Sequence, residues 1–354
     1  MVLGSRVMAE AQLTPEQALE RAAEAGIHQL RIPTPFAVGR VNCYLIEDKP
    51  LTLVDTGPNS GKALDELQRQ LADHGHSISD LELVILTHQH IDHLGLVEII
   101  VEHSGAEVAA IDVAVRRLAN FGEDAEREDE VAAQLMRRHG IPENVVYALQ
   151  SVSRSFRGWG AKANVTRPLQ DGEDLKLGNR TLQVLHRPGH SPSDTVFWDP
   201  DRRILIAADH LIAHISSNPL ISRPLDDSGE RTQALVAYID SLKKTREMPA
   251  EIVLSGHGEP ITDHVSLITD RLALHERRAE KLYGLVAEQP RTGYDLAQAL
   301  WGNVAVTQAF LTLSEVIGHL DLLVNDGRVR EVEDGEVVRY EATGDANDAV
   351  GGEG

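Results

Sequence analysis

Ligand-type side chains follow one apolar run after another in this chain, and this pattern constrains the fold more than any other feature. The densest case is THQHIDH over 87–93, which follows the apolar stretch 81–86 and precedes a segment with helical spacing. His88, His90, Asp92 and His93 can therefore project from a strand end into one opening. Nitrogen and oxygen ligands at this density suit Zn²⁺, with Mn²⁺ or Fe²⁺ as alternatives.

Four further strand-like runs place an aspartate or a histidine just past their ends. Asp55 ends LTLVDTG, His190 lies in RPGHSPSD, Asp209 ends RILIAAD, and His257 lies in SGHGEP. Any one of them alone is equally compatible with an ordinary loop residue. Together they predict several strand ends that converge on one edge of a sheet, where α/β proteins place their sites. The alternation of strand-like and helical segments predicts an α/β fold.

These motifs, in this order, resemble those of the metallo-β-lactamase-fold hydrolase superfamily over about residues 28–262. HQHIDH matches the family pattern H-x-H-x-D-H. The resemblance implies a four-layer αβ/βα sandwich that holds two metal ions, usually zinc. By position, it implies a first metal on His88, His90 and His190, a second on Asp92, His93 and His257, and Asp209 as a bridge. Asp55 and Thr87 would support these ligands by hydrogen bonds.

The implied chemistry is hydrolysis by a metal-bound hydroxide that attacks an ester-like carbonyl in a thioester, ester or lactone. Asp92 and Asp209 are the predicted catalytic carboxylates. No serine or cysteine nucleophile is required, and Cys43, which lies in a strand-like run, is expected to pack in the core. His93 argues against subclasses that lack this ligand. His90, which stands where a glutamate would otherwise be, disfavours a flavodiiron-like oxygen reductase.

The sequence predicts a catalytic domain over 1–265 with a helical insertion at about 112–160. Residues 266–343 are expected to form a small winged-helix domain, and 344–354 a flexible tail. This combination resembles the branch called β-lactamase-like protein 2, with glyoxalase II as the nearest analogy for thioester hydrolysis. Residues 276–341 contain seven basic and twelve acidic residues, which disfavours DNA binding. The domain is instead expected to cover the catalytic domain or to form a dimer.

Two segments are candidates for substrate contact. The loop 210–225 starts at Asp209 and contains His214 and Asn218, and the insertion 112–160 contains Trp159. We expect them to form an apolar-walled entrance for a small acyl substrate. The alternatives are that the insertion is a pair of crossover helices and that His214 is an ordinary loop histidine.

The net charge of −21, from 55 acidic and 34 basic residues, disfavours anionic polymers and membranes. A single-stranded RNA endonuclease on the same metals is the second hypothesis, with Arg137, Arg138, Arg154 and Arg157 as its candidate groove. A binding module with a relic site is the third. One cysteine, no membrane-spanning run and no apolar signal core before residue 17 predict a cytoplasmic enzyme. Met8 is an alternative start.

Overall fold

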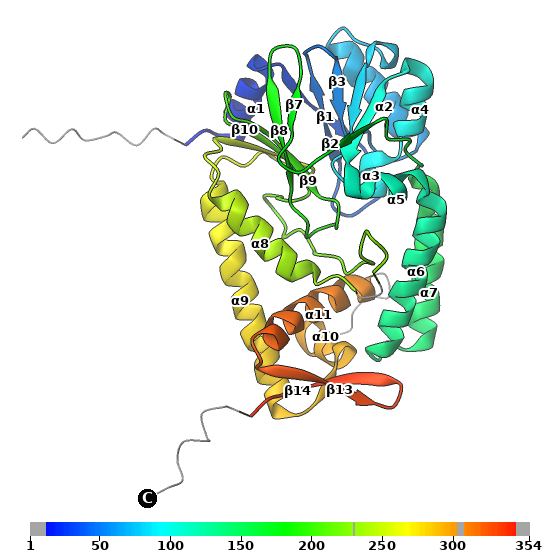
Figure 1. Cartoon of the computed structure of the whole chain (residues 1–354), viewed down its shortest axis with the longest axis vertical. Helices are drawn as coiled ribbons and strands as arrows, with labels where there is room; N and C mark the ends of the chain where they lie inside the picture. The colour runs from blue at the N-terminus through cyan, green and yellow to red at the C-terminus, as the bar shows by residue number, and fades with distance from the viewer. Residues whose placement is uncertain (1–11, 229–230, 303–307, 345–354) are drawn as a thin grey trace, which may run out of the picture.

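The computed structural model describes residues 12–228, 231–302 and 308–344. Two sheets with covering helices lie at one end of the molecule, and a small third sheet lies at the other end (Figure 1). Met8 and nearly all of the expected tail lie outside the described residues. Among the helices of the described part, none has the length and apolar character needed to cross a membrane.

The first sheet has six strands in the order β1-β2-β3-β4-β5-β6. β1 to β3 pair antiparallel, and β3 to β6 pair parallel. Every residue of β2, β3 and β4 is buried, as expected for strands covered on both faces, and Cys43 packs within β2. The strands are β1 (Ile27–Ile32), β2 (Val41–Ile46), β3 (Thr52–Val54), β4 (Leu83–Ile85), β5 (Glu107–Ile111) and β6 (Arg167–Leu169).

The second sheet has five strands in the order β11-β10-β9-β8-β7. Its side chains alternate between two cores, because successive residues of a strand point to opposite faces. In β10, Ile204 and Ile206 join the core between the sheets, whereas Leu205 and Ala207 pack beneath two covering helices, α8 (Ala234–Arg246) and α9 (His264–Glu288). The strands are β7 (Asp174–Lys176), β8 (Thr181–His186), β9 (Thr195–Asp199), β10 (Ile204–Ala208) and β11 (Ile252–Ser255).

Two helices of the first half, α1 and α2, begin where the sequence provides capping groups. Thr14 and Gln17 form a capping box at α1, and Ser60 Oγ accepts from Ala63 N at the predicted helix 59–74. Leu67 and Leu71 of this helix join the large core cluster that contains the first sheet. The two sheets with helices outside them confirm the predicted αβ/βα sandwich. The helices are α1 (Pro15–Glu24), α2 (Gly61–Asp73), α3 (Ile91–Leu94) and α4 (Val97–Ser104), and η1 is a short 3₁₀ turn (Ile78–Asp80).

The segment 112–160 is helical, as the sequence predicts, with a break at 139–142. Its two long helices pack on each other and extend from the sheets to the far end of the molecule (Figure 1). The elements are η2 (Asp112–Ala114), α5 (Val115–Ala119), α6 (Phe121–Arg138), α7 (Glu143–Phe156) and η3 (Arg157–Trp159).

The C-terminal elements have a core of their own and also pack against earlier parts of the chain. α11 contributes Val316 and Leu320 to the local core, and Leu313 and Ile317 to a cluster with Met136 of α6. The order of helices and hairpin is the predicted one, with the short strand β12 added, and its winged-helix character stays a prediction. The elements are α8 (Ala234–Arg246), α9 (His264–Glu288), β12 (Arg291–Thr292), α10 (Gly293–Trp301), α11 (Ala309–Asn325), β13 (Val329–Asp334) and β14 (Val337–Ala342).

Candidate metal centre

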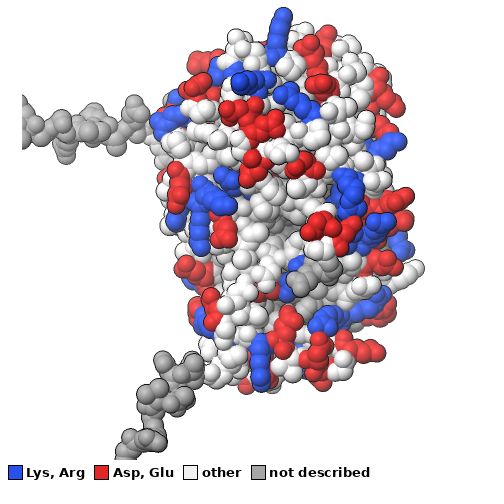
Figure 2. Space-filling model, in the orientation of Figure 1, with Lys and Arg blue, Asp and Glu red and all other residues white. Residues whose placement is uncertain are grey.

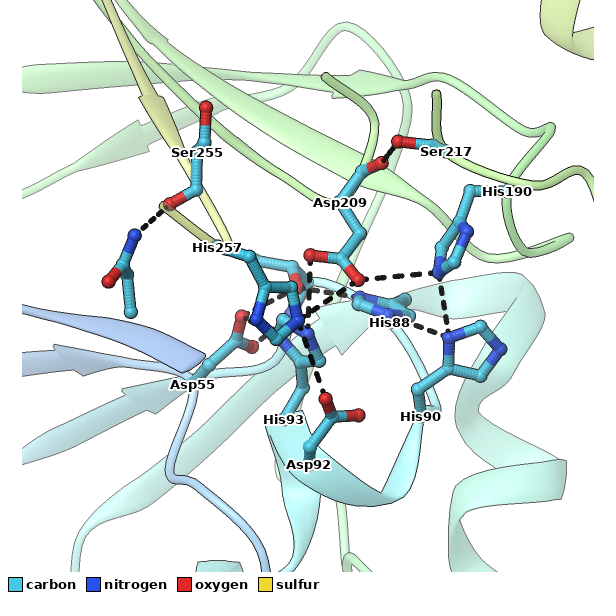
Figure 3. Close-up of polar contacts among 12 residues, drawn as sticks. Asp55, His88, His90, Asp92, His93, His190, Asp209, Ser217, Ser255 and His257 are labelled. Carbon is cyan, nitrogen blue, oxygen red and sulfur yellow. Dashed lines mark hydrogen bonds and ion pairs between the residues drawn. The ribbon is translucent and has the colours of Figure 1, made fainter. Parts of the chain in front are cut away.

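The structure brings the seven predicted ligands to one place between the two sheets (Figure 3). They come from the turns after β4, β10 and β11, from the helix α3 that follows the first of these turns, and from the loop between β8 and β9. We call His88, His90 and His190 the first group, and Asp92, His93 and His257 the second group. The potential ligand atoms within each group lie no more than 4.8 Å apart.

Asp209 lies between the two groups. Its Oδ2 is 3.4 Å from Nε2 of His190 and 3.5 Å from Nε2 of His257, and its Oδ1 is 3.4 Å from Nε2 of His93. One carboxylate therefore contacts histidines of both groups, as the predicted bridging position requires.

Hydrogen bonds to oxygen orient four of the histidine rings so that Nε2 points inward. His93 Nδ1 lies 2.7 Å from Asp55 Oδ2, His190 Nδ1 lies 3.2 Å from the Asn218 carbonyl, and His257 Nδ1 lies 2.9 Å from the Arg40 carbonyl. Because these oxygens only accept, each Nδ1 carries the proton, and Nε2 of a neutral ring keeps a lone pair for a cation.

Asp55 and Thr87 hold the first turn of the centre together. Asp55 accepts from Thr87 N at 2.9 Å and from Thr87 Oγ1 at 2.8 Å. Since the hydroxyl has one proton and gives it to the carboxylate, Thr87 Oγ1 must accept from His88 Nδ1, which is 3.0 Å away. His90 is the exception to the pattern, because its Nδ1 faces His88 and His190 at 3.1 and 2.9 Å.

A local irregularity in β10 aims Asp209 at the centre. The register against β11 shifts between Ile206 and Ala208, and Ala208 has a φ of 42°. Gly256 allows the close approach, because a Cβ there would lie 2.1 Å from Asp209 Oδ1. Glycine is therefore required at 256 by the position of the carboxylate.

The residues of the centre fit a divalent cation. His93 Nε2 and Asp209 Oδ1 are buried and have no hydrogen-bond partner. Uncompensated buried polar atoms are costly, and both are atoms that ligate metals. The centre thus lacks a partner at the two atoms where a metal ion would supply one, and the fold implies divalent metal binding.

Burial and neighbouring charges shift the pKa values of the histidines in the centre in two directions. Burial lowers the pKa of His88 well below its usual value and that of His90 to about 3, so both rings are neutral at pH 7. Burial has the same tendency at His257, but Asp209 and Asp92 outweigh it and raise the pKa to about 9. The pKa of His93 is raised likewise, chiefly by Asp209 and Asp55. A cation in the second group would replace these protons.

The three predicted substrate residues lie in three different environments. His214 is exposed and lies against Gly258, where a Cβ would be 2.7 Å from its Nδ1. Asn218 supports His190 through its carbonyl, and its side chain donates to the Leu311 carbonyl of α11 at 3.1 Å. Trp159 is half-buried, and its carbonyl accepts from Asn59 N. Substrate contact by these residues stays a prediction.

A cavity of about 310 Å³ lies beside the second group, at His214 and Gly258. Apolar walls come from Val38 and Ala213, and the charged lining comes from Arg31, Arg40 and Glu259. The loop 210–225 contributes Ala213 and His214 to this cavity, whereas the described residues that line it include none from 112–160. Sequence reasoning missed the two arginines, because they lie about fifty residues before the histidine motif and in no motif of their own.

Comparison with known proteins agrees with the metal centre described above. A sequence model described as the metallo-beta-lactamase superfamily matches residues 37–257. A probable metallo-hydrolase of Bacillus subtilis, YqjP, is 32% identical over 312 residues, or 88% of this chain and 96% of that protein. The acyl-coenzyme A thioesterase MBLAC2 of Bos taurus is 31% identical over 139 residues, 36% of this chain and 40% of its own length.

Among solved structures, a metallo-beta-lactamase family protein from Thermus thermophilus has a similar architecture. The TM-score is 0.76 with 27% identity, and the alignment covers 90% of this chain and 99% of that one. The similarity extends beyond the matched residues 37–257 and so includes most of the C-terminal elements.

Proposed function

Because this chain belongs to the metallo-beta-lactamase superfamily, whose members are hydrolases, we propose that it is a dinuclear zinc hydrolase of ester-like carbonyl compounds, with thioesters first among them. Hydrolase activity and metal binding follow from the family. The number and identity of the metals and the class of substrate are the proposal.

The observation that carries the proposal is the orientation of the imidazoles. Four Nδ1 atoms are held by oxygen acceptors, and the four Nε2 atoms face inward around Asp209. In this proposal the first group holds one metal, the second group holds the other, and Asp209 is shared. Three imidazoles on one side and a carboxylate with two imidazoles on the other are donor sets that suit Zn²⁺.

Two divalent cations bound there would lower the pKa of water and polarise a carbonyl oxygen. The side chains of this chain would then do the rest. Asp92 would orient the attacking water by accepting its hydrogen bond, because this carboxylate lies in the second group, 3.4 Å from His257. His214 stands at the cavity edge and would donate a proton to the leaving sulfur or oxygen.

Two observations favour a small acyl compound over a polyanion. The cavity combines apolar walls with two arginines, of which Arg40 is paired with Glu66 and Arg31 lies 3.9 Å from Glu259. Basic and acidic side chains are mixed on the face shown in Figure 2, and an uncharged area runs through its middle. The thioesterase named among the relatives favours a thioester within this class.

The RNA hypothesis gains no support from its candidate arginines. Arg137 is paired with Glu143, Arg138 with Glu333, and Arg157 with Asp129 and Glu126. Three of the four predicted groove residues are thus neutralised by neighbouring carboxylates. We therefore keep RNA only as a comparison substrate.

The C-terminal elements are proposed to support the centre and to pair with a second copy of the chain rather than to read DNA. Asn218, which orients His190, donates to the Leu311 carbonyl of α11, and Ile221 N donates to Ser314 Oγ. α11 therefore packs on the loop that starts at Asp209. A duplex-DNA binding measurement at physiological salt tests whether these elements read DNA. A sedimentation measurement tests whether two copies of the chain pair.

The deciding experiment combines metal analysis with a hydrolysis screen on one preparation. Esters and thioesters of rising chain length, lactones, phosphodiesters and labelled RNA are compared by kcat/KM. We expect two zinc ions per chain and the highest kcat/KM with an acyl substrate, reduced in the His214→Ala and Trp159→Ala variants. Full activity without transition metal contradicts the metal assignment. RNA as the best substrate, with both variants unaffected on esters, contradicts the acyl assignment.

A further inference from the structure

A second histidine cluster lies on the outer strand of the first sheet, away from the centre. We propose that His28, His74, His76 and Glu47 bind one transition-metal dication there, as a structural site separate from catalysis. The site depends on none of the residues used in the proposed function.

The contacts converge on the Glu47 carboxylate. His28 Nε2 lies 2.9 Å from Glu47 Oε2, and His76 Nε2 lies 3.4 Å from Glu47 Oε1. The His74 and His28 rings are 4.2 Å apart between centroids, and potential ligand atoms of His28, His74 and Glu47 lie within 4.8 Å of one another. Three imidazoles thus surround one carboxylate.

The backbone fixes these positions before any metal binds. His28 lies in β1, paired with Leu45 of β2, and Glu47 N donates to the Gly26 carbonyl at 2.9 Å. His74 caps the end of α2. The chain then turns at Gly75, whose φ is 78°, so that His76 N bonds back to the Leu71 carbonyl. Three segments that are distant in sequence therefore present their ligands from ordered backbone.

The donor set and its exposure suit a metal taken up from solution. Three nitrogens and one carboxylate oxygen are a tetrahedral set for Zn²⁺, and imidazoles also suit Cu²⁺ and Ni²⁺. The side chains of His28, His76 and Glu47 are 15%, 28% and 40% exposed, so the cluster is open to solvent yet partly enclosed. A surface ion pair between Glu47 and His28 is the simpler explanation that the experiment must exclude.

The cluster and the centre lie at opposite ends of β2. Val41 forms a bridge with His257 at one end, and Glu47 follows Ile46 at the other. At about 3.3 Å per strand residue, the two sites are about 20 Å apart. β1 is the edge strand of its sheet, so a metal here would tie that edge to the end of α2. We expect added stability and no change in turnover.

The test compares full-length holoprotein with a double variant, His28→Gln with His76→Gln. The control is His103→Gln, an exposed histidine of α4. Each protein is first loaded with zinc at the centre, and metals per chain are then counted by mass spectrometry after equilibrium dialysis against micromolar ZnCl₂. We expect one additional zinc in the parent and the control and a higher Tm than in chelator-washed holoprotein. In the double variant, affinity at this site should fall by at least about 100-fold, since even outer partners of a metal are worth 10–100-fold.

Unchanged kcat in the double variant separates this site from the centre, because a failure of the proposed hydrolase would leave the zinc count here unaffected. Equal zinc content and equal Tm response in the parent and the double variant overturn the proposal, as does binding that requires millimolar zinc. If the double variant does not fold, Glu47→Gln replaces it, because the amide keeps the shape of the side chain and removes the anionic ligand.

Discussion

Two regions of this protein gather buried histidines, and they pair them with different neighbours. In the metal centre the rings follow strand ends and turn Nε2 toward shared carboxylates. In the second region, which we call the helical seam, His139 follows α6, His275 lies in α9 and His319 lies in α11. All three seam histidines are buried, as are His88, His93 and His257 of the centre, whereas His90 and His190 are partly exposed.

The seam differs from the centre in how its histidines and its carboxylate are paired. His319 Nδ1 lies 2.6 Å from the Glu315 carbonyl, and its Nε2 lies 3.1 Å from His275 Nδ1. The Glu315 carboxylate is paired with Arg278. Burial lowers the pKa of both histidines to about 4. Proximity of histidines is thus a weak sign of a metal. A stronger sign is the combination found in the centre, where oxygen acceptors hold the Nδ1 atoms and the shared carboxylate contacts histidines but no arginine or lysine of the described residues.

The largest expected effect is a difference between the two regions. It appears when the carboxylate beside the histidines is removed from the centre and, in a second variant, from the seam. Asp209→Ala should lose at least one metal and lower kcat/KM by about 10³-fold, or about 4 kcal/mol, because both groups depend on this residue. Glu315→Ala makes the same kind of change in the seam and should keep both metal content and turnover. Metal analysis and kinetics check both variants. Equal losses in the two would remove the distinction between the regions.

The next effect divides the centre itself. Asp92→Ala removes a carboxylate from the second group only, so the second metal should weaken by about 100-fold while the first stays bound. His90→Ala should do the reverse. Stepwise chelation monitored by metal content separates the two affinities. Unchanged metal content and turnover in Asp92→Ala would contradict its assignment.

Gly256→Ala tests whether the geometry of Asp209 matters as much as its presence. A Cβ at 256 would lie 2.1 Å from Asp209 Oδ1, so the carboxylate must move. A misplaced ligand should reduce kcat/KM by roughly 10-fold to 100-fold. Gly122→Ala is the matched control, because a Cβ in that part of α6 meets nothing within 4 Å. Parent-like kinetics for Gly256→Ala would show that the centre tolerates the shift.

The part of the centre that the sequence predicts is the part carried by side chains in strand-end motifs. Asp209 stands directly after an apolar run, and His88 and His190 follow such runs within a few residues. A run of that kind has few alternatives to a buried strand. The Arg40 and Asn218 carbonyls that orient His257 and His190 carry no such signal, since any residue provides a carbonyl.

The packing of distant segments was harder to predict for the same reason. α11 is apolar on several sides, which is consistent with a buried helix but does not say what buries it. The structure shows that Leu313 faces Met136 of α6, while Val316 faces the local core. Likewise, the arginines of the cavity reach it from β1, which contains Arg31, and from the loop before β2, which contains Arg40. Such contacts depend on tertiary arrangement and leave no pattern within either segment.

The smallest expected effect concerns acid stability in the seam. His139 is buried and stacks on Tyr340, and burial lowers its pKa to about 3, with Arg231 and Arg138 adding to the shift. Its usual pKa is 6.5, so below pH 6.5 the unfolded chain takes up a proton that the folded chain refuses. The stabilising contribution is therefore complete above pH 6.5 and is lost as the pH falls toward 3. Between pH 7 and pH 5 the parent should lose about 1–2 kcal/mol more than His139→Gln, which cannot titrate. Denaturant unfolding at both pH values measures this difference, and equal losses would show that the His139 ring is protonated in the folded seam.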